Sequence, residues 1–221
     1  MFDSIVKLDT HVNNADNAYM AGIKQFNEDE ALERAMHVFW YRGYAATSMQ
    51  DLAQATGVLR GSLYNAYGDK QAIFLLAFAR YQRRYLDAVR AKLAVDDAAV
   101  ALHDFFAYTI ESMSEPIPQV GDTLPSLTRG CLTTKIATDE KAMDEPVRQA
   151  LRDMLESLGD VLEQRLSAAD ALPRLNLPLK DTTRLLVTFT RGNVVMERIY
   201  HAPGELLAAA DSLIKILLSP K

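Results

Sequence analysis

Residues 47–70 contain two helical segments that are each too short to be stable alone. Ser48 stands directly before the first apolar residue of one segment and Asp51 lies three residues further on, which is the pattern of a helix N-cap. Gly57 ends this helix, and the segment LRGSLYNAY forms the next one, which ends at Gly68. Helices of one or two turns need tertiary contacts to be stable. The sequence therefore requires longer helices on both sides to pack around this pair.

The rest of the chain is also patterned as helix. Asn27 and Glu30 form a capping-box pattern before a helix over 28–42, and Asp69 can cap a long helix that ends near Leu93. Apolar residues at steps of three and four predict further helices over 97–115, 126–137, 144–167, 181–200 and 203–218. Prolines mark the loops between them, at Pro116, Pro118, Pro125, Pro173 and Pro178. No segment requires a strand, so an all-α fold is predicted.

Composition restricts the class of protein. The 221 residues are 49% hydrophobic, as in a globular chain with a real core. No apolar run is long enough to span a membrane, and residues 1–22 lack the pattern of a signal or transit peptide. We therefore expect a mobile N-terminal arm over 1–22, a cytoplasmic location and no membrane partner. The single cysteine, Cys131, excludes an internal disulfide framework.

The usual signatures of enzymes are missing from the sequence. The four histidines are scattered without the spacing of metal ligands, and no glycine-rich phosphate loop follows a predicted strand. Pairs of acidic residues fall on helix faces that are expected to be solvated. We predict a protein that is not an enzyme and that uses no metal or cofactor.

The spacing Ala53-x-x-x-Gly57 is typical of a helix-turn-helix. A small residue lets two helices approach closely, and glycine adopts the turn conformation that other residues resist. Leu52, Val58 and Leu63 would fill the small core between the helices. The second helix would then expose arginine, asparagine and hydroxyl groups, which can contact guanine, adenine and phosphates. A compact helical corner that does not touch DNA is compatible with the same spacing.

Residues 26–78 resemble the N-terminal domain of TetR-family transcriptional regulators. The motifs F-x-x-x-G-Y-x-x-T-S-M, D-L-A-x-x-x-G-V and S-L-Y-x-x-Y-x-x-K occur in order. The resemblance implies a helix-turn-helix domain over 23–70 and a helical effector-binding and dimerisation domain over 71–221. It also implies a homodimeric repressor that a small-molecule effector releases from a palindromic operator in double-stranded DNA. The candidate DNA-binding residues are Lys24, Thr47, Ser48, Arg60, Gly61, Ser62, Tyr64, Asn65, Tyr67 and Lys70.

The charge of the chain departs from the pattern of the family. Relatives often carry a basic stretch before the first helix, where this sequence keeps only Lys24. The net charge is −5, and acidic residues outnumber basic ones within 26–70. Few phosphate contacts predict a weak dependence of DNA affinity on salt, so binding would depend on base contacts and on the two-fold dimer. The rival hypothesis is a helical, partner-binding dimer that no longer binds DNA.

Apolar stripes in the C-terminal half indicate either an intrachain core or a four-helix bundle between two copies, as the resemblance implies. The candidate interface residues are Leu151, Met154, Leu158, Leu162, Leu185, Phe189, Gly192 and Met196. The candidate effector pocket consists of side chains that are equally common in an ordinary core: Phe105, Phe106, Tyr108, Met113, Leu127, Cys131, Met154, Phe189 and Met196. The sequence does not identify the effector.

Cys131 lies in the segment RGCLTT, which resembles a Gly-Cys-Leu segment found in one branch of the family. Arg129, two residues earlier, could lower the pKa of the thiol if it points the same way. Two hypotheses stay open for this residue. It is either a buried structural cysteine or the sensor of a thiol-switched regulator.

Overall fold

The computed structural model describes residues 26–115, 128–139 and 144–220, and within these ranges it contains helices and no β-strand. The all-α prediction is therefore confirmed. Several predicted features lie outside the described residues. They are the arm over 1–22, Lys24, Leu127 and the loop prolines Pro116, Pro118 and Pro125.

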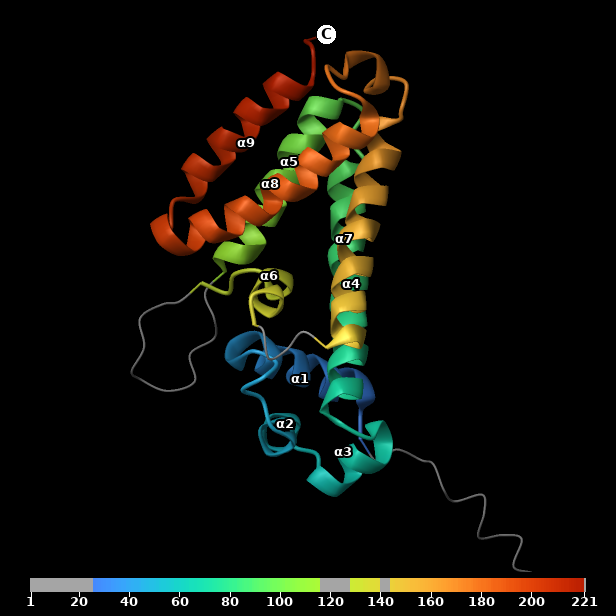
Figure 1. The fold of residues 1–221 in the computed structure, drawn as a ribbon, viewed down its shortest axis with the longest axis vertical. Coiled ribbons are helices and arrows are strands. Elements are labelled where there is room, and N and C mark those ends of the chain that lie inside the picture. Colours follow the sequence, from blue (N-terminus) through green and yellow to red (C-terminus); the bar gives the residue numbers. More distant parts are fainter. Residues whose placement is uncertain (1–25, 116–127, 140–143, 221) are drawn as a thin grey trace, which may run out of the picture.

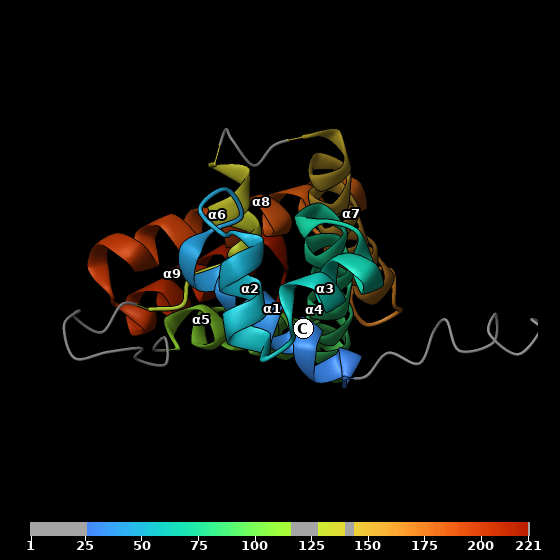
Figure 2. The same ribbon diagram turned by 90° about the horizontal axis from the view of Figure 1, so that it is seen from below.

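Three helices form one end of the molecule, and a fourth leads away from them (Figure 1). They are α1 (Glu28–Arg42), α2 (Met49–Thr56) and α3 (Arg60–Tyr67), followed by the long helix α4 (Lys70–Leu93). Helix α1 packs against both α2 and α4. The view from below shows α1, α2 and α3 together at this end (Figure 2). The two short helices thus have the tertiary support that their length requires.

The N-caps of these helices follow the sequence pattern. The Asn27 side chain accepts hydrogen bonds at the start of α1, and Ser48 and Asp51 form a complete capping box at α2. The Asp69 carboxylate accepts from the backbone N–H of Ala72 at 2.8 Å and caps α4. The Glu30 side chain takes a different role from the predicted one, because it pairs with Arg34 on the exposed face of α1.

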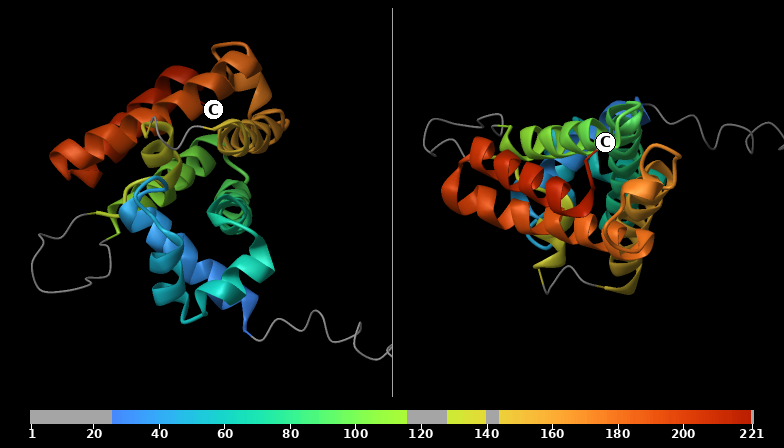
Figure 3. Two further views of the ribbon diagram at one scale, coloured as in Figure 1. Left: turned by 60° about the horizontal axis from the view of Figure 1, so that its bottom comes forward. Right: turned by 90° about the horizontal axis from the view of Figure 1, so that it is seen from above.

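The remaining helices build a second bundle around α4. They are α5 (Ala98–Ser114), α6 (Leu132–Ala137), α7 (Glu145–Leu166), α8 (Leu179–Tyr200) and α9 (Pro203–Leu217). A short 3₁₀ helix, Leu172–Arg174, lies in the connection that contains Pro173 and Pro178. Helix α7 runs along α4, and α9 packs on α5 and forms an antiparallel pair with α8 (Figure 3). No helix within the described ranges is long and apolar enough to cross a membrane.

Helix α6 begins at Leu132, six residues later than the sequence predicts. Gly130 has φ +64°, a left-handed conformation that glycine adopts easily and that does not fit within a right-handed helix, so the helix begins after it. Its N–H donates to the carbonyl of Met113 at 2.8 Å, while the N–H of Arg129 donates to the carbonyl of Glu115 at 2.7 Å. The segment before α6 is therefore fixed to the end of α5, and it carries Cys131 to the centre of the molecule.

Candidate DNA-binding surface and internal cavity

The helix pair α2 and α3 closes over a small apolar core. Leu52 and Leu63 are 0% and 1% exposed, and Val58 in the turn between the helices is also buried. Gly57 has φ +72° and ends α2 in the left-handed conformation, as predicted for the turn. With the apolar side chains turned inward, the polar side chains of α3 lie on its outer face.

The outer face of α3 carries the side chains that sequence analysis selected. Arg60, Tyr64 and Asn65 are exposed, and Ser62 is half-buried. Within this face the Arg60 guanidinium donates to the Tyr64 hydroxyl at 3.3 Å and lies 5.5 Å from the centre of its ring. Gly61 has no neighbouring atom within 4 Å of the position that a Cβ would take. No side chain therefore covers the helix backbone at Gly61, and the contact with Tyr64 restricts the position of the Arg60 side chain.

Two candidate residues face inward rather than outward. Thr47 is 2% exposed, and its hydroxyl donates to the carbonyl of Gly43 at 2.7 Å. Tyr67 is buried, and its ring lies 6.2 Å from the ring of Phe26. Ser48 is exposed, but its hydroxyl donates to Asp51 at 2.7 Å within the capping box. In this conformation the three side chains contact other residues of the helix-turn-helix domain and support its surface from within.

Lys70 is held at the edge of this surface by Tyr44. Its ammonium donates to the backbone carbonyl of Tyr44 at 2.9 Å and lies 4.5 Å from the centre of the Tyr44 ring. The Tyr44 ring is buried and packs against Phe39 and Phe74, so it offers a rigid platform. An ammonium has three N–H donors, and the Tyr44 carbonyl uses one of them.

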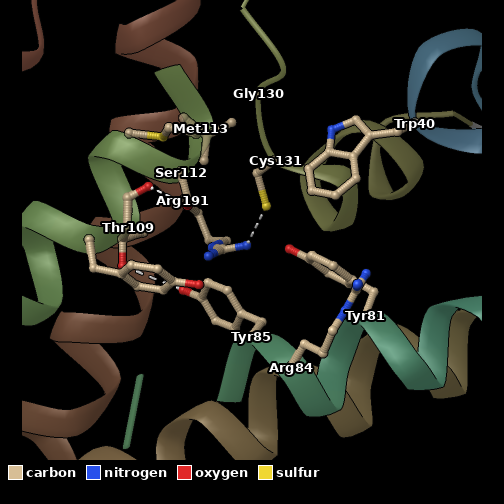
Figure 4. A pocket seen from close by; sticks show the side chains of 12 residues that line it. Trp40, Tyr81, Arg84, Tyr85, Thr109, Ser112, Met113, Gly130, Cys131 and Arg191 are labelled. Atoms are coloured by element: carbon tan, nitrogen blue, oxygen red, sulfur yellow. Dashed lines mark hydrogen bonds between the residues drawn. The ribbon is translucent and has the colours of Figure 1, made fainter. Parts of the chain in front are cut away.

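A cavity of about 100 Å³ lies where the two bundles meet (Figure 4). Helix α1 contributes Trp40, and the segment before α6 contributes Gly130 and Cys131. The other lining residues come from α4 (Tyr81, Arg84, Tyr85), α5 (Tyr108, Thr109, Ser112, Met113) and α8 (Arg191, Val194). The cavity therefore touches both the end of the helix-turn-helix domain and the C-terminal bundle.

Cys131 and Arg191 meet in this cavity. The guanidinium donates to the Cys131 sulfur at 3.2 Å, from Nη1 (Figure 4). Burial raises the pKa of the Cys131 thiol, but the nearby positive charge and hydrogen bonds from Thr134 and Thr133 outweigh burial and hold the pKa below its usual value. The expected partner, Arg129, instead lies over the ring of Trp40 and pairs with Glu115.

Two tyrosine hydroxyls stand beside the guanidinium of Arg191. Figure 4 shows the Tyr81 hydroxyl pointing toward the space between the Cys131 sulfur and the guanidinium. The Tyr85 hydroxyl lies 3.5 Å from the hydroxyl of Thr109. Burial raises the pKa of Tyr81 well above its usual value and that of Tyr85 to about 12, so both phenols stay protonated at neutral pH. Protonated phenols can donate hydrogen bonds to an acceptor in the cavity.

Hydrogen bonds join the walls of this cavity to the end of α1. The Trp40 indole N–H donates to the carbonyl of Arg129 at 2.8 Å. The Lys135 ammonium, in α6, donates to the carbonyls of Trp40 at 2.7 Å and Tyr41 at 2.8 Å. Carbonyls at a helix end lack partners within the helix, so these contacts complete the end of α1. The segments on both sides of Cys131 are therefore joined by hydrogen bonds to the helix that supports the helix-turn-helix.

The predicted pocket residues divide between the cavity and other places. Tyr108, Met113 and Cys131 line the cavity. Phe105, Phe106 and Met154 are buried in the core, Phe189 packs edge-on against Phe106 at 5.5 Å, and Met196 is exposed. Trp40, Tyr81, Tyr85 and Arg191 were not among the predicted pocket residues. For Arg191 the available signal was its place between Val187 and Val194 at helical spacing on α8.

The predicted interface residues also divide by helix. Leu151, Met154, Leu158 and Leu162 of α7 are buried within the chain. On α8, Leu185 and Met196 are exposed, Gly192 is exposed with open space around it, and Phe189 is half-buried. Val195 and Ile199 extend the exposed stripe with 51% and 61% of their surfaces accessible. Within the described ranges, no group of three or more His, Cys, Asp or Glu residues could hold a metal ion.

Comparison with known proteins places the helix-turn-helix in a family. Residues 31–77 match the family described as bacterial regulatory proteins, tetR family. The HTH-type transcriptional repressor ComR of Escherichia coli K12 is 40% identical over 86 residues, which are 38% of this chain and 41% of that protein. The regulator YezE of Bacillus subtilis 168 is 36% identical over 94 residues, which are 42% of this chain and 48% of that protein. The chain thus spans less than half the length of either of these curated relatives.

Solved structures extend the similarity over nearly the whole chain. A cysteine mutant of the TetR family transcriptional regulator CifR, complexed with 26 bp double-strand operator DNA, has a TM-score of 0.73 at 26% identity, covering 88% of this chain and 98% of that chain. The reduced form of E. coli NemR has a TM-score of 0.74 at 18% identity, covering 88% and 97%, and supports the fold alone. The matched helix-turn-helix and the fold shared with these structures support a TetR-family transcriptional regulator.

Proposed function

We propose that the chain is a homodimeric repressor that binds a palindromic operator and is released by a small molecule in the C-terminal bundle. The observation that carries the DNA part is the outer face of α3, where Arg60, Tyr64 and Asn65 are exposed above a closed apolar core. The operator complex of CifR, which has the same two-part fold, supports it.

Each exposed side chain of α3 has a distinct role in this proposal. Arg60 can donate two parallel hydrogen bonds to guanine, and Asn65 can pair with adenine in the same way. Tyr64 keeps the arginine in place through their 3.3 Å contact and presents its hydroxyl to phosphate. Gly61 lets the backbone of α3 approach the DNA without a side chain between them. Ser62 and Lys70 contact phosphates at the rim.

Thr47, Ser48 and Tyr67 contribute by position in this proposal. The buried Thr47 and Tyr67 fix the angle between α1, α2 and α3, and the capping box of Ser48 fixes the N-terminus of α2. A helix N-terminus with exposed N–H groups favours a phosphate. Loss of any of these three would weaken DNA binding through the shape of the surface.

We propose that the dimer forms through the exposed stripe of α8. Leu185, Gly192, Val195, Met196 and Ile199 recur at helical spacing on this face. Helices that expose such a stripe commonly pack against a second copy, and Gly192 permits a close crossing. The apolar residues of α7 lie inside the chain and support α8 from behind. A dimer fixes the spacing of the two reading helices on the operator.

Release of DNA would begin at the cavity. The effector would occupy the space beside Trp40 and Cys131 and shift the segment that holds the end of α1. Lys135 would pass this shift to the carbonyls of Trp40 and Tyr41. Such coupling requires only that the effector favours one conformation over the other, typically by about 1–3 kcal/mol.

The first test is selection of bound duplexes from a random DNA pool. We expect the unmodified chain to enrich a palindrome, and Arg60→Ala and Tyr64→Ala to lose it. Arg90→Ala is the matched control, because Arg90 is an exposed arginine that pairs with Asp87 on α4, away from α3. No enriched sequence at low salt would refute DNA binding and favour the partner-binding dimer.

A second candidate function is a thiol-switched regulator, which the contact between Cys131 and Arg191 favours. The guanidinium stabilises the thiolate, which is the nucleophilic form. With hydrogen peroxide, the sulfur would attack one oxygen, the O–O bond would break, and hydroxide would leave to give a sulfenic acid. We expect peroxide to weaken operator binding of the unmodified chain and not of Cys131→Ser. An equal response of both proteins would contradict this switch.

A further inference from the structure

Arg191 brings a positive charge into the cavity without a carboxylate to meet it. The side chain is largely buried. Its Nε donates to the hydroxyl of Thr190 at 3.1 Å, and its Nη1 donates to the sulfur of Cys131 at 3.2 Å. No Asp or Glu among the described residues lies within ion-pair distance of it. A guanidinium has more N–H donors than these two contacts use, and its planar fork matches a carboxylate.

A second unused donor faces the same space. The Tyr81 hydroxyl points between the Cys131 sulfur and the Arg191 guanidinium (Figure 4). It has no hydrogen-bond partner within the part of the chain that the structure describes. Buried polar groups are normally paired, so an unpaired hydroxyl beside an unmatched guanidinium indicates the place of an acceptor. Together the two groups could hold both oxygens of one carboxylate.

The other arginines near the cavity are already neutralised. Arg84 lies 2.7 Å from the carboxylate of Glu33, and Arg129 lies 2.7 Å from that of Glu115. The cavity therefore offers one positive charge to a ligand. A monoanion would balance this charge, whereas a phosphate dianion would leave an excess negative charge in a buried site.

The size and the walls of the cavity limit the rest of the ligand. Its volume of about 100 Å³ equals roughly three water molecules at ~30 Å³ each. Trp40, Met113 and Val194 provide apolar walls that suit a short carbon chain. The half-exposed side chain of Arg84, with 58% of its surface accessible, marks an opening to solvent.

We propose that this cavity binds a small aliphatic monocarboxylate such as propionate, because a volume of about 100 Å³ leaves room for only a short carbon chain. The carboxylate contacts Arg191 and Tyr81, and the carbon chain lies against Trp40 and Val194. The ligand competes with the Cys131 sulfur for the guanidinium. The effect of this ligand on DNA binding rests on the proposed function, in which a small molecule in this cavity acts as the effector.

Titration calorimetry with propionate tests the site on the full chain. We expect propionate to bind the unmodified protein at least tenfold more tightly than Arg191→Met, and Tyr81→Phe to weaken binding severalfold. Arg184→Met is the matched control, because Arg184 is an exposed arginine on the same helix and its side chain is 75% exposed. Propionamide, which has the same shape without the charge, should bind at least tenfold more weakly than propionate. Equal binding of the two compounds, or equal binding by Arg191→Met, would overturn the inference.

Two further measurements keep the test decisive. If Arg191→Met fails to unfold cooperatively, Arg191→Lys replaces it, and we expect weaker propionate binding because lysine keeps the charge and loses the fork. Operator binding of the same proteins is measured without propionate. A chain that binds its operator but not propionate overturns the carboxylate site alone. A chain that binds propionate but no DNA overturns the proposed regulator and leaves the site in place.

Discussion

Replacing Lys70 by methionine should remove the phosphate contact that we propose for each DNA-binding domain of the dimer. The ammonium is held by the Tyr44 carbonyl at 2.9 Å and by the face of the Tyr44 ring, so its position is fixed before DNA arrives. Methionine keeps an unbranched apolar side chain there and removes the charge. The change therefore isolates the electrostatic contribution of this residue to DNA binding.

The expected magnitude follows from the release of counterions. Each neutralised phosphate contributes about 0.9 to the slope of log affinity against log salt, so a dimer that loses two contacts loses about 1.8. Raising the salt from about 50 to about 200 mM should then reduce the ratio of the DNA affinities of the unmodified protein and Lys70→Met by about tenfold. The slope of the unmodified protein should itself be small, because acidic residues outnumber basic ones around α1, α2 and α3.

Fluorescence anisotropy on the selected operator, at several salt concentrations, measures both slopes. Lys92→Met is the control, because Lys92 is an exposed lysine near the far end of α4 and should leave the slope unchanged. The stability of Lys70→Met should fall by about 1–2 kcal/mol from the lost hydrogen bond and cation–π contact. Parallel salt lines for Lys70→Met and the unmodified protein would refute the assignment of Lys70 to phosphate.

Four other predictions concern the core, the pKa of the thiol, the reactivity of the thiol and the dimer. Leu52→Ala should lower the free energy of unfolding by about 2–5 kcal/mol, because Leu52 is fully buried. Urea denaturation measures this loss, and Gln54→Ala is the control because Gln54 is exposed. Equal losses of stability in the two variants would contradict the prediction. The folded-state pKa of Cys131 lies below its usual value, so the stabilisation of the unmodified protein relative to Cys131→Ser should be complete above the unfolded-state pKa and lost as the pH falls through the folded-state pKa. Arg191→Met should slow alkylation of the thiol by iodoacetamide at neutral pH, and an unchanged rate would exclude Arg191 as the cause of its reactivity. Met196→Glu on the exposed face of α8 should convert a dimer into a monomer in light scattering and abolish operator binding, and a dimer that persists would place the interface elsewhere.

Local sequence patterns predicted most of the helices. Ser48 and Asp69 act as N-caps because their side chains bond to backbone N–H groups within the next three residues, which requires no distant contact. Gly57 ends α2 through its own backbone conformation. The apolar spacing of the small core, with Leu52 and Leu63 facing inward, follows from helical periodicity.

Patterns of this kind failed where a contact spans a long stretch of the chain. Periodicity predicted a helix near 126, but Gly130 bonds to Met113 in another helix, and α6 starts later. For the apolar stripe of α7 it left two possibilities, an intrachain core or an interface between copies, and in the structure this stripe is buried within the chain, where α7 packs on α4 and α8. An apolar stripe shows that a face will be buried and leaves open which surface will bury it.

The sequence by itself determined the helices, their caps, the small core of the helix-turn-helix and the outward residues of α3, because all of these depend on neighbours within a few positions. The tertiary structure alone decided the chemistry of the cavity. Cys131 and Arg191 are 60 residues apart in the chain and meet at 3.2 Å, while Trp40 reaches the same space from a third region. The sequence pointed to the nearby Arg129 as the partner of the thiol. The packing of α8 against α5 and the turn at Gly130 chose Arg191, because the direction of a side chain is set by the helix that carries it and by the helices around it.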